Sequence, residues 1–386
     1  MTWKTVKLGD ICDISIGKTP PRGEKRYWDK EKQKDNVWLS IADLSSINGR
    51  YISDSKEYVS DEGASLFKPV PSDTLVMSFK LSIGKLALTQ RELRTNEAIA
   101  ALPIKDESVA SKEFLYHCLS SIDWNKIAGN DEKVKGKTLN KKKLNALDVI
   151  LPPLAEQKSI VAKLDNTFDE INAVLNATEN KLSKLDKFRR LYLSFEMNQE
   201  DNAYKLSELC ELEKNQDNFK NMIYVGMEDI ESGTGKFIGE MKPKEVKSKT
   251  FRFGSDNLLY GRLRPYLNKV LLPEFEGHCS TEIYPIKLGK KLLREYLFYW
   301  FVQDKTVHAI NSSTTGTRMP RANLNKIFEM KINLPSLEQQ RKALNRITNV
   351  DKELTIVKDL YSMKLIELRN LKKALLLEAL QDKAIN

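Results

Sequence analysis

Two Gly-Lys-Thr triplets, at residues 17–19 and 136–138, are the part of this sequence that most resembles a phosphate-binding loop. A Walker loop requires another glycine five residues before its second glycine, and the chain has Cys12 and Asp131 at those positions. The G-x-S-x-G and H-E-x-x-H patterns are missing, as are a G-x-G-x-x-G after a strand and the NPPY-like tetrad of an amino-methyltransferase. We therefore expect no nucleotide hydrolysis, no catalytic residues and no cofactor.

The cysteines and histidines do not form a metal-binding pattern. The four cysteines have no C-x-x-C spacing and are Cys12, Cys118, Cys210 and Cys279. His278 lies beside Cys279, but two ligands are too few for a structural zinc site. Because Cys12 and Cys210 stand among leucines and isoleucines, we interpret the cysteines as buried free thiols and expect no metal.

Basic residues outnumber acidic ones, and several lie in loops that could contact a polyanion. The 386-residue chain has 63 Lys plus Arg against 53 Asp plus Glu, for a net charge of +10. This excess favours a polyanionic partner, and a merely basic soluble protein is the alternative. The loop GKTPPR supplies Lys18, Thr19 and Arg22 on a chain stiffened by two prolines, which suits contact with phosphates or base edges. Solvated loop charge is the alternative for these residues.

A second pair of loops follows an expected strand in each half of the chain. FKLSIGK supplies Lys80 and Lys85, and RLRPYLNK supplies Arg262, Arg264 and Tyr266. The planar fork of arginine can contact two acceptors on guanine in the major groove of DNA, whereas lysine suits single contacts. We predict DNA contacts at these positions, with surface salt bridges as the alternative.

A third pair of loops precedes the strand that leads to each long helical segment. GNDEKVKGKTLNKKKL contains Lys137 and Thr138, and INSSTTGTRMPRANL contains Thr317 and Arg318. Backbone N–H groups of a turn, a hydroxyl and a nearby cation can bind a phosphate, so we predict phosphate contacts here. The run of lysines at 141–143 is more typical of a solvated helix start.

The two halves of the chain carry similar segments in the same order. LPPLAEQKSIVAKL at 151–164 matches LPSLEQQRKALNRI at 334–347, and each opens a long helical pattern. Further matches pair 8–12 with 206–210, 38–44 with 224–230, 73–80 with 256–263, 112–119 with 294–301 and 136–144 with 316–324. Such a repeat predicts one structural unit built twice, and two similar units can be related by a rotation, as the subunits of a homodimer are. A chain of this kind suits a target that is read in two halves.

The repeat also bears on paired carboxylates, of which Glu228 and Asp229 are an example, because such pairs could suggest acid-base chemistry. Glu228 and Asp229 match Ala42 and Asp43 in the first half. A duplicated catalytic site would not be expected to lose half of its acids. We therefore do not assign these carboxylates to catalysis.

Hydrophobic periodicity predicts two globular α+β units at 1–150 and 199–334 and long helices at 151–198 and 335–386. At 1.5 Å per residue each helix is about 60 to 70 Å long. The apolar stripe of the first helix contains Ile171, Leu175, Leu182 and Leu185, widened by Val174, Phe188 and Leu191. The stripe of the second contains Val350, Leu354, Val357, Tyr361, Leu368, Leu371 and Leu375. We predict that the helices form an antiparallel intramolecular coiled coil that separates the two units. The alternative is that each helix packs on its own unit.

No apolar run in the sequence approaches the roughly 18 to 20 residues needed to cross a bilayer. The first residues, MTWKTVKLGD, lack the apolar core of a signal peptide. We therefore expect a cytoplasmic protein.

With these motifs in order, the chain resembles the specificity subunit of a type I restriction-modification system. The resemblance covers essentially the whole sequence and rests on LPPLAEQ followed by IVAKLD at 151–165, with a weaker copy from residue 334. The second copy departs at Ser336 and Ala343, and it lacks the Lys-Leu-Asp ending.

The resemblance implies a non-catalytic protein with two target-recognition domains, 1–150 and 199–334, each reading one half of a bipartite double-stranded DNA target. It also implies that the long helices set the unspecified gap and dock two methyltransferase subunits, and that motor-nuclease subunits join the full complex. A coiled-coil scaffold that binds DNA without sequence preference is the competing hypothesis.

Overall fold

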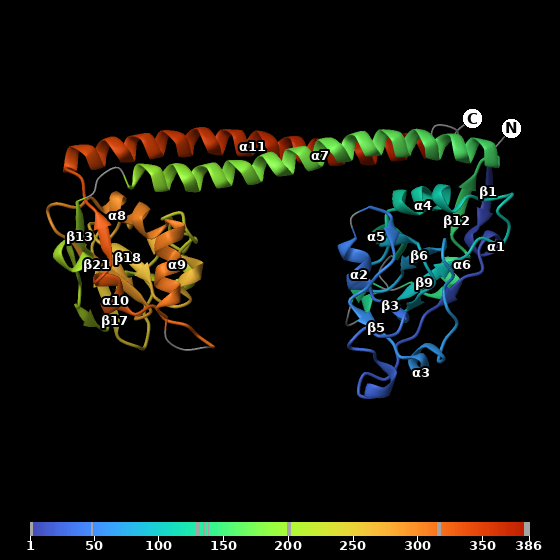
Figure 1. Ribbon diagram of the computed structural model, residues 1–386, viewed down its shortest axis with the longest axis horizontal. Helices are drawn as coiled ribbons and strands as arrows, with labels where there is room; N and C mark the ends of the chain where they lie inside the picture. The colour runs from blue at the N-terminus through green and yellow to red at the C-terminus, as the bar shows by residue number, and fades with distance from the viewer. Residues whose placement is uncertain are drawn as a thin grey trace. The chain divides into compact units, whose positions relative to one another are not determined.

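The computed structural model describes residues 3–47, 49–128, 132–133, 136–137, 139–198, 202–314 and 318–381 (Figure 1). The chain forms two compact units, and each contains a globular part and a portion of two long helices. The first unit consists of Met1–Asn176 with Leu365–Asn386, and the second of Ala177–Lys364.

The first unit contains two main sheets. The five-stranded sheet has the order β2 (Ser15–Ile16), β9 (Ile99–Leu102), β6 (Leu75–Ser78), β7 (Leu86–Thr89) and β4 (Tyr51–Ile52). The three-stranded sheet has the order β5 (Glu57–Tyr58), β3 (Val37–Leu39) and β8 (Arg94–Thr95). Two further pairs join β1 (Lys4–Lys7) to β12 (Asp148–Leu151) and β10 (Glu132–Lys133) to β11 (Gly136–Lys137).

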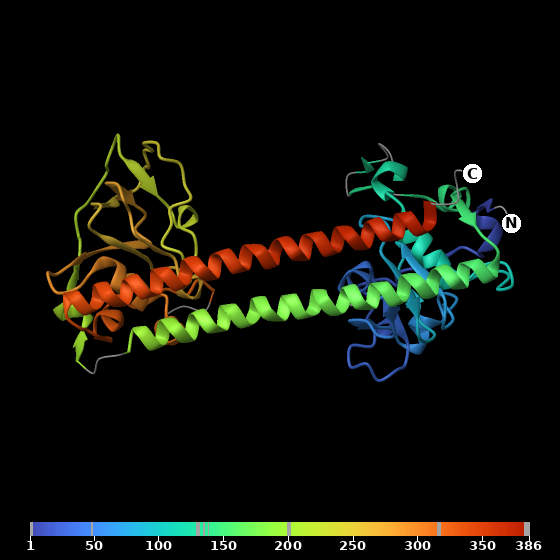
Figure 2. The same cartoon turned by 90° about the horizontal axis from the view of Figure 1, so that it is seen from above.

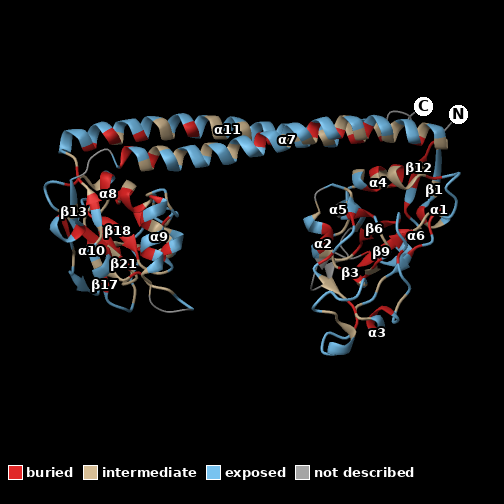
Figure 3. Cartoon of the chain, viewed as in Figure 1, coloured by how far each residue is buried: buried red, intermediate tan, exposed pale blue. Residues whose placement is uncertain are grey.

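The helices of the first globular part are short. In chain order they are α1 (Leu8–Ile11), α2 (Ile41–Ser46), α3 (Asp61–Ala64), α4 (Lys112–Ser121), α5 (Trp124–Ala128) and α6 (Lys141–Asn145). Helix α4 buries Phe114, Leu115 and Leu119 in the core that also contains Leu75 and Met77 of β6. Buried residues concentrate between this helix and the sheet (Figure 3).

The second unit repeats this plan. One four-stranded sheet has the order β14 (Cys210–Leu212), β21 (Ile283–Leu288), β18 (Leu258–Gly261) and β19 (Val270–Leu271). The other has the order β15 (Gln216–Asp217), β17 (Thr250–Phe253), β20 (Gly277–Cys279) and β16 (Ile223–Val225). Strand β13 (Ala203–Lys205) pairs with β22 (Lys331–Asn333), and the helices are α8 (Arg294–Phe301), α9 (Asp304–Ser312) and α10 (Leu324–Phe328).

Matching hydrogen bonds show which residues of the two units are equivalent. The Ser40 N–H donates to Asp43 at 2.9 Å, and the Gly226 N–H donates to Asp229 at 2.7 Å. In each case the aspartate caps a short helical turn directly after a strand, which explains why one carboxylate is kept in both halves without a catalytic role. The apolar run VWLSIADL at 37–44 is therefore a strand only as far as Leu39 and continues as a helix from Ile41.

One part of the sequence alignment was wrong. We matched 136–144 with 316–324, a spacing of 180 residues, but the structure places Asn140 and Asn323 at the same helix N-cap. Each asparagine side chain accepts a hydrogen bond from the backbone N–H three residues later. The true spacing is therefore 183 residues, so the basic residues after the two turns are shifted by three positions relative to our alignment.

The long helices are α7 (Leu154–Glu196) and α11 (Leu337–Gln381), and within each unit their segments lie side by side (Figure 2). In the second unit, Glu196 pairs with Arg346 at 2.7 Å and Arg189 with Asp351 at 2.7 Å. The partner number rises as the α7 number falls, so the segments are antiparallel. In the first unit, Leu164, Phe168 and Ile171 of α7 share a core with Leu376 and Leu380 of α11.

The contact face of the helices is narrower than the sequence stripe. Val174, Phe188 and Leu191, expected to widen it, are 39%, 50% and 61% exposed, and Leu371 is 47% exposed. The buried residues of α11 include Leu354, which belongs to the predicted stripe, and Leu365, which does not. Lys372 also faces α7, with its Nζ 4.7 Å from the Phe168 ring and 3.0 Å from Asn172 Oδ1. A lysine can cover an apolar ring with its stem while its ammonium group reaches a polar partner.

An ion pair attaches the first globular part to α7. Arg50 donates two hydrogen bonds to Asp165, at 2.7 and 2.8 Å, and the buried His117 ring lies 3.0 Å from the same carboxylate. Burial works to raise the pKa of Asp165, but its bonds with Arg50 and His117 hold it below the ordinary value. Burial lowers the pKa of His117, against the opposing effect of Asp165. These residues border a cleft of about 430 Å³ beside α7.

The thiols are free, as expected, and three of them are buried, whereas Cys118 is half-buried. Burial raises the pKa of Cys12 and of Cys210 to about 12. His278 accepts or donates hydrogen bonds with Thr250 and the Lys244 carbonyl, so both ring nitrogens have partners within the protein. In the part of the chain that the structure describes, no group of three or more metal-ligating side chains occurs, and no helix is long and apolar enough to cross a membrane.

Candidate nucleic-acid interface

Strand order brings the predicted DNA-contacting loops of the first unit to one end of the five-stranded sheet. Strands β2 and β6 both run antiparallel to β9, with Ile16 opposite Ala100 and Ser78 opposite Ile99. The loop after β2 (17–22), the loop after β6 (79–85) and the residues just before β9 therefore lie at the same end. The Leu139 N–H also donates to the Phe79 carbonyl at 2.9 Å, which brings the third predicted segment to this end.

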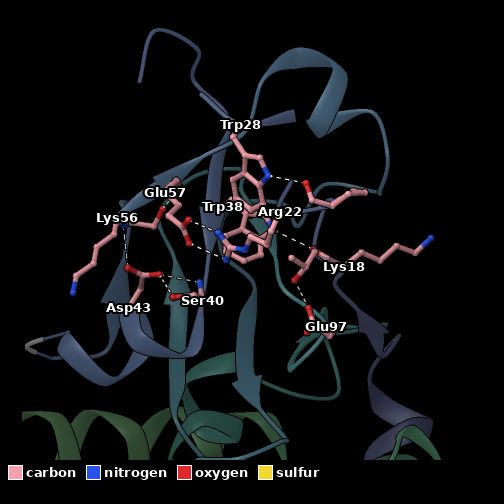
Figure 4. A network of polar contacts seen from close by, with 12 residues as sticks. Lys18, Arg22, Trp28, Trp38, Ser40, Asp43, Lys56, Glu57 and Glu97 are labelled. Carbon is pink, nitrogen blue, oxygen red and sulfur yellow. Dashed lines mark hydrogen bonds and ion pairs between the residues drawn. The ribbon is translucent and has the colours of Figure 1, made fainter. Parts of the chain in front are cut away.

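Two tryptophans hold the 17–22 loop through its backbone (Figure 4). The Trp38 indole N–H donates to the Lys18 carbonyl at 3.1 Å, and the Trp28 indole N–H donates to the Pro21 carbonyl at 3.2 Å. The Thr19 hydroxyl donates to the Glu97 carboxylate just before β9. The loop is thus fixed before any ligand binds, while the Lys18 side chain remains exposed.

Arg22 lies against both tryptophans (Figure 4). Its guanidinium carbon is 4.2 Å from the Trp28 ring centre and 4.8 Å from that of Trp38, distances at which a cation is attracted to an aromatic face. Glu57 forms an ion pair with the same guanidinium. Because the Arg22 side chain is still 54% exposed, it presents a positive, oriented group on the surface.

The carboxylate that partners Thr19 is surrounded by the other predicted cations. Partial burial works to raise the pKa of Glu97, but the Thr19 hydroxyl and the charges of Lys80 and Arg22 hold it below its usual value. The loop that carries Lys80 and Lys85 is tied at its base, where the Ser78 N–H donates to the Lys85 carbonyl and the Lys85 N–H donates to the Ser78 hydroxyl. Lys85 is exposed and Lys80 is half-buried.

The second unit has its predicted loop at the equivalent sheet end. Strand β18 runs antiparallel to β21 with Gly261 opposite Ile283, so the 262–269 loop lies beside Glu282. The Ala322 N–H donates to the Arg262 carbonyl at 2.8 Å, the counterpart of the Leu139 to Phe79 hydrogen bond. Leu263 and Arg321 also form a bridge between the two segments.

Arg262 binds other side chains of the protein, which corresponds to the surface salt bridge that was the alternative to a DNA contact. Its Nε donates to Glu282 at 2.9 Å and its Nη1 to the Tyr284 hydroxyl at 2.6 Å. Arg321, which our sequence analysis did not single out, donates to Glu282 as well, at 2.8 Å from Nη2. The bonds from the two arginines, together with their charges, hold the pKa of Glu282 below its ordinary value, and partial burial works the other way. One carboxylate thus holds two guanidinium groups at the base of the loop.

The outer part of this loop is exposed. Arg264 and Arg318 are exposed and Tyr266 is 53% exposed. The Arg264 N–H donates to the Pro320 carbonyl at 2.8 Å, so Arg318 is two residues along the chain from this contact. Three predicted contacts, Thr138, Thr317 and the Lys137 side chain, lie outside the described residues.

The structure therefore gathers Lys18, Thr19, Arg22, Lys80 and Lys85 at one end of a sheet in the first unit, and Arg262, Arg264, Tyr266 and Arg318 at the equivalent end in the second. The residues that position these groups were not among those predicted from the sequence: Trp28, Trp38, Glu57, Glu97, Glu282 and Arg321. The signal available for the tryptophans was aromatic residues interleaved with basic ones. No local pattern linked Glu282 to an arginine 20 positions earlier in the chain.

The chain matches a known protein family over most of its length. A family model described as the type I restriction modification DNA specificity domain matches residues 1–184 and 198–362. The type I restriction enzyme EcoDI specificity subunit of Escherichia coli is 24% identical over 418 residues, covering 98% of this chain and 87% of that protein. The MjaVIII specificity subunit of Methanocaldococcus jannaschii is 22% identical over 403 residues, covering 92% and 87%.

Solved structures show the same fold. A structure described as the basis of complex assembly and conformational transition of the type I R-M system superposes with a TM-score of 0.75 at 15% identity, covering 99% of this chain and 98% of that chain. The HsdS subunit from Thermoanaerobacter tengcongensis superposes with a TM-score of 0.52 at 16% identity, covering 99% and 97%.

Proposed function

Because the chain belongs to the type I restriction-modification DNA specificity family, we propose that it is the subunit that selects the DNA sequence for such a complex. Each globular unit reads one half of a bipartite target in double-stranded DNA. The observation that carries this proposal is the duplicated sheet end, where exposed cations lie on loops held by buried or paired side chains. Two such surfaces discriminate far better than one, because each well-made base contact contributes only about 1 to 3 kcal/mol.

We assign a type of DNA contact or a structural role to each predicted loop residue. Lys18, Lys80, Lys85 and Arg318 supply contacts to phosphates, Arg22 and Arg264 contact base edges, and Tyr266 contacts the DNA through its aromatic ring. Thr19 and Arg262 hold their loops through Glu97 and Glu282. Lys137, Thr138 and Thr317 remain predicted phosphate contacts.

We further propose residues 1–150 and 199–334 as the recognition domains and 151–198 and 335–386 as spacer helices that set the gap between the half-sites. The compact units divide the chain differently, because each includes part of both long helices. A pair of continuous helices is suited to a spacer role, since an α-helix keeps a constant rise of about 1.5 Å per residue.

The long helices also offer a surface for the proposed methyltransferase partners. Ile356, Leu360 and Met363 of α11 are 55%, 60% and 58% exposed, and their spacing of four and three residues places them on one face. Phe188, Leu191 and Phe195 of α7 are likewise 50%, 61% and 61% exposed. Contiguous exposed apolar residues of this kind are typical of interaction surfaces. We propose that two methyltransferase subunits dock here and that motor-nuclease subunits join the full complex.

In this proposal the chain directs catalysis and performs none itself. It acts in the cytoplasm, together with the proposed DNA target and partner subunits. The duplicated carboxylates Asp43 and Asp229 cap short turns, which accounts for them without a reaction.

The decisive experiment is genome-wide mapping of methylated adenines with and without the gene for this chain, in the presence of the methyltransferase subunits. We expect a split target with a fixed gap that disappears with the gene. A continuous target, or methylation that is independent of the gene, contradicts the proposal. Binding that depends on salt but shows no sequence preference would instead support a nonspecific DNA-binding scaffold.

A further inference from the structure

The two units share a backbone irregularity at equivalent positions of the candidate interface. Leu81, two residues after Phe79, has φ of 64°, and Arg264, two residues after Arg262, has φ of 50°. Phe79 and Arg262 are equivalent because each N–H donates at 2.9 Å to the residue just before the neighbouring strand, Ala98 and Glu282. A left-handed conformation is uncommon for residues other than glycine, asparagine and aspartate, and for a leucine it is a strained one.

Both loops are held in this shape by hydrogen bonds at their bases. In the first unit, the Gly84 N–H donates to the Ser78 carbonyl at 2.9 Å, and the buried Ser78 hydroxyl donates to the Ser82 carbonyl. A side chain at Gly84, which has φ of 84°, would collide with Trp124. The first loop therefore has a fixed conformation with Leu81 at its turn.

The second loop is held in the same way. The Gly261 N–H donates to the Lys269 carbonyl and the Arg264 N–H to the Pro320 carbonyl, both at 2.8 Å. Asn268, at the far side of the turn, is also left-handed, with φ of 46°. Backbone strain persists where the surrounding structure enforces it, and such positions concentrate at functional sites.

Each loop uses this conformation to expose an apolar side chain. Leu81 is 53% exposed on the wall of an open cleft of about 590 Å³, and Tyr266 is 53% exposed within the one-turn helix η4 (Pro265–Leu267). Lys80 and Lys85 flank Leu81 in the first loop, and Arg264 precedes Tyr266 in the second. An exposed apolar side chain beside cations matches the chemistry of DNA, in which apolar base faces are stacked between two rows of phosphates.

We propose that Leu81 and Tyr266 are wedges that insert against the base stack of the two DNA half-sites and hold it open. This inference rests on the proposed function, and it adds a mechanical role to sequence reading. Proteins that insert apolar side chains between base steps unstack and kink the duplex. A partner that methylates a base must first take that base out of the stack, so a wedge beside the target lowers the cost of its reaction.

The test uses the complex of the full chain with its methyltransferase subunits and a duplex containing the mapped target. One adenine in each half-site is replaced, in separate duplexes, by 2-aminopurine, whose fluorescence rises when it leaves the stack. Leu81→Asn removes the wedge and suits a left-handed backbone, so the loop is expected to keep its shape. Tyr266→Ser removes the second wedge, whereas Tyr266→Phe keeps the ring.

A matched control is Val109→Asn. Val109 is 47% exposed, and its carbonyl accepts a hydrogen bond from Gln157 near the start of α7, away from the 79–85 loop. The Val109→Asn variant therefore replaces an exposed apolar side chain of the first unit with asparagine and leaves the proposed wedge unchanged.

We expect Leu81→Asn to suppress the fluorescence rise in one half-site and Tyr266→Ser to suppress it in the other, with weaker binding and an unchanged target sequence. Tyr266→Phe and Val109→Asn should behave as the parent protein does. Parent-level fluorescence in both Leu81→Asn and Tyr266→Ser overturns the wedge. So does a loss of methyltransferase subunits from the complex with normal fluorescence, because the side chains would then contact protein. If the parent complex itself shows no sequence-specific binding, the proposed function fails rather than the wedge alone.

Discussion

Gln157 and Gln340 make the same hydrogen bonds in the two units. Each side chain is fully buried, and its amide nitrogen donates to two carbonyls: Val109 and Pro152 for Gln157, Lys291 and Pro335 for Gln340, at 2.8 to 2.9 Å. Each amide oxygen accepts a backbone N–H just before the helix that covers the sheet, from Ser111 at 2.8 Å and Leu293 at 2.9 Å. The glutamine of the LPPLAEQ and LPSLEQQ motifs therefore fastens a long helix to its globular part.

Replacing either glutamine with alanine should destabilise its own unit. Gln157→Ala leaves one buried N–H and two carbonyls without this partner, and a buried unsatisfied group costs about 1 to 3 kcal/mol. We expect the free energy of unfolding to fall by roughly 2 to 4 kcal/mol, measured by urea denaturation. Lys158→Ala, one exposed residue further along α7, is the control and should change little. Equal stability of the two variants would show that the motif glutamine is not an anchor.

His117 should make stability depend on pH above the range in which carboxylates titrate. Its pKa is lowered in the folded state, so below the ordinary value of about 6.5 the unfolded chain binds the extra proton first. Stability is then fully present above pH 6.5 and falls as the pH drops below it, by at most about 1.4 kcal/mol per pH unit. In His117→Gln the free energy of unfolding should depend less on pH in this range. His308→Gln, at an exposed position of α9, should leave this dependence unchanged; the reverse result refutes the assignment.

Asp165 should add a second loss of stability at lower pH. Its pKa is depressed in the folded state, so its contribution is present above the unfolded value of about 3.9 and is lost as the pH falls through the folded value. In Asp165→Asn the loss of stability on acidification should be smaller. Overall stability should also fall, because Arg50 loses its charged partner. Calorimetry between pH 2 and 5 measures both effects. The same loss of stability between pH 5 and 2 in Asp165→Asn and in the parent protein would contradict the role given to the Arg50 ion pair.

Arg22 and Lys18 should affect DNA binding in different ways. Loss of a base contact in Arg22→Ala should weaken binding by about 1 to 3 kcal/mol and relax the preference at one position of one half-site. Lys18→Ala should weaken all sequences alike and reduce the salt slope by about 1. Lys105→Ala is the control, since Lys105 is exposed and follows β9 at the end opposite Glu97. A uniform effect of Arg22→Ala on all sequences would assign it to a phosphate instead.

Lengthening both helices should change the gap in the target and nothing else. Seven residues inserted after Asn176 in α7 and after Lys364 in α11 add about 10.5 Å and preserve the face of each helix. At roughly 3.4 Å per base pair the gap should grow by about three base pairs. Methylation mapping reads the result directly. Altered half-sequences, or a gap of the original length, would refute the spacer role.

Much of the fold could be predicted from the sequence because it is written in local patterns. The alternation and apolar runs of β6, β9, β18 and β21, and the long helices without proline, are signals of this kind. The predicted elements were wrong where one or two side chains determine the local structure. Ser40 and Asp43 form a cap that converts the end of an apolar run into a helix, and Lys372 takes a contact position in α11 that periodicity gave to Leu371. A heptad count also drifts relative to a helix of 3.6 residues per turn.

The candidate site could be predicted only in part. Loop composition identified the basic segments, but their meeting at one sheet end depends on the antiparallel pairing of β2, β6 and β9, which joins residues about 80 positions apart. Partners such as Glu57 for Arg22 and Glu282 for Arg262 come from other strands, so no spacing rule reveals them. The left-handed turn at Leu81 has no local signal at all, because leucine is not a residue that favours it.

The anchoring of each globular part within its own unit has an evolutionary consequence. Gln157 and Asp165 fasten the first part to α7, and Gln340 fastens the second to α11. Recombination could exchange the gene segment for one recognition domain and keep these anchoring residues. The protein would then recognise a new sequence in one half of its target, and the other half would be unchanged. A single exchange would therefore replace one half of the target at once, whereas each point substitution alters only one contact.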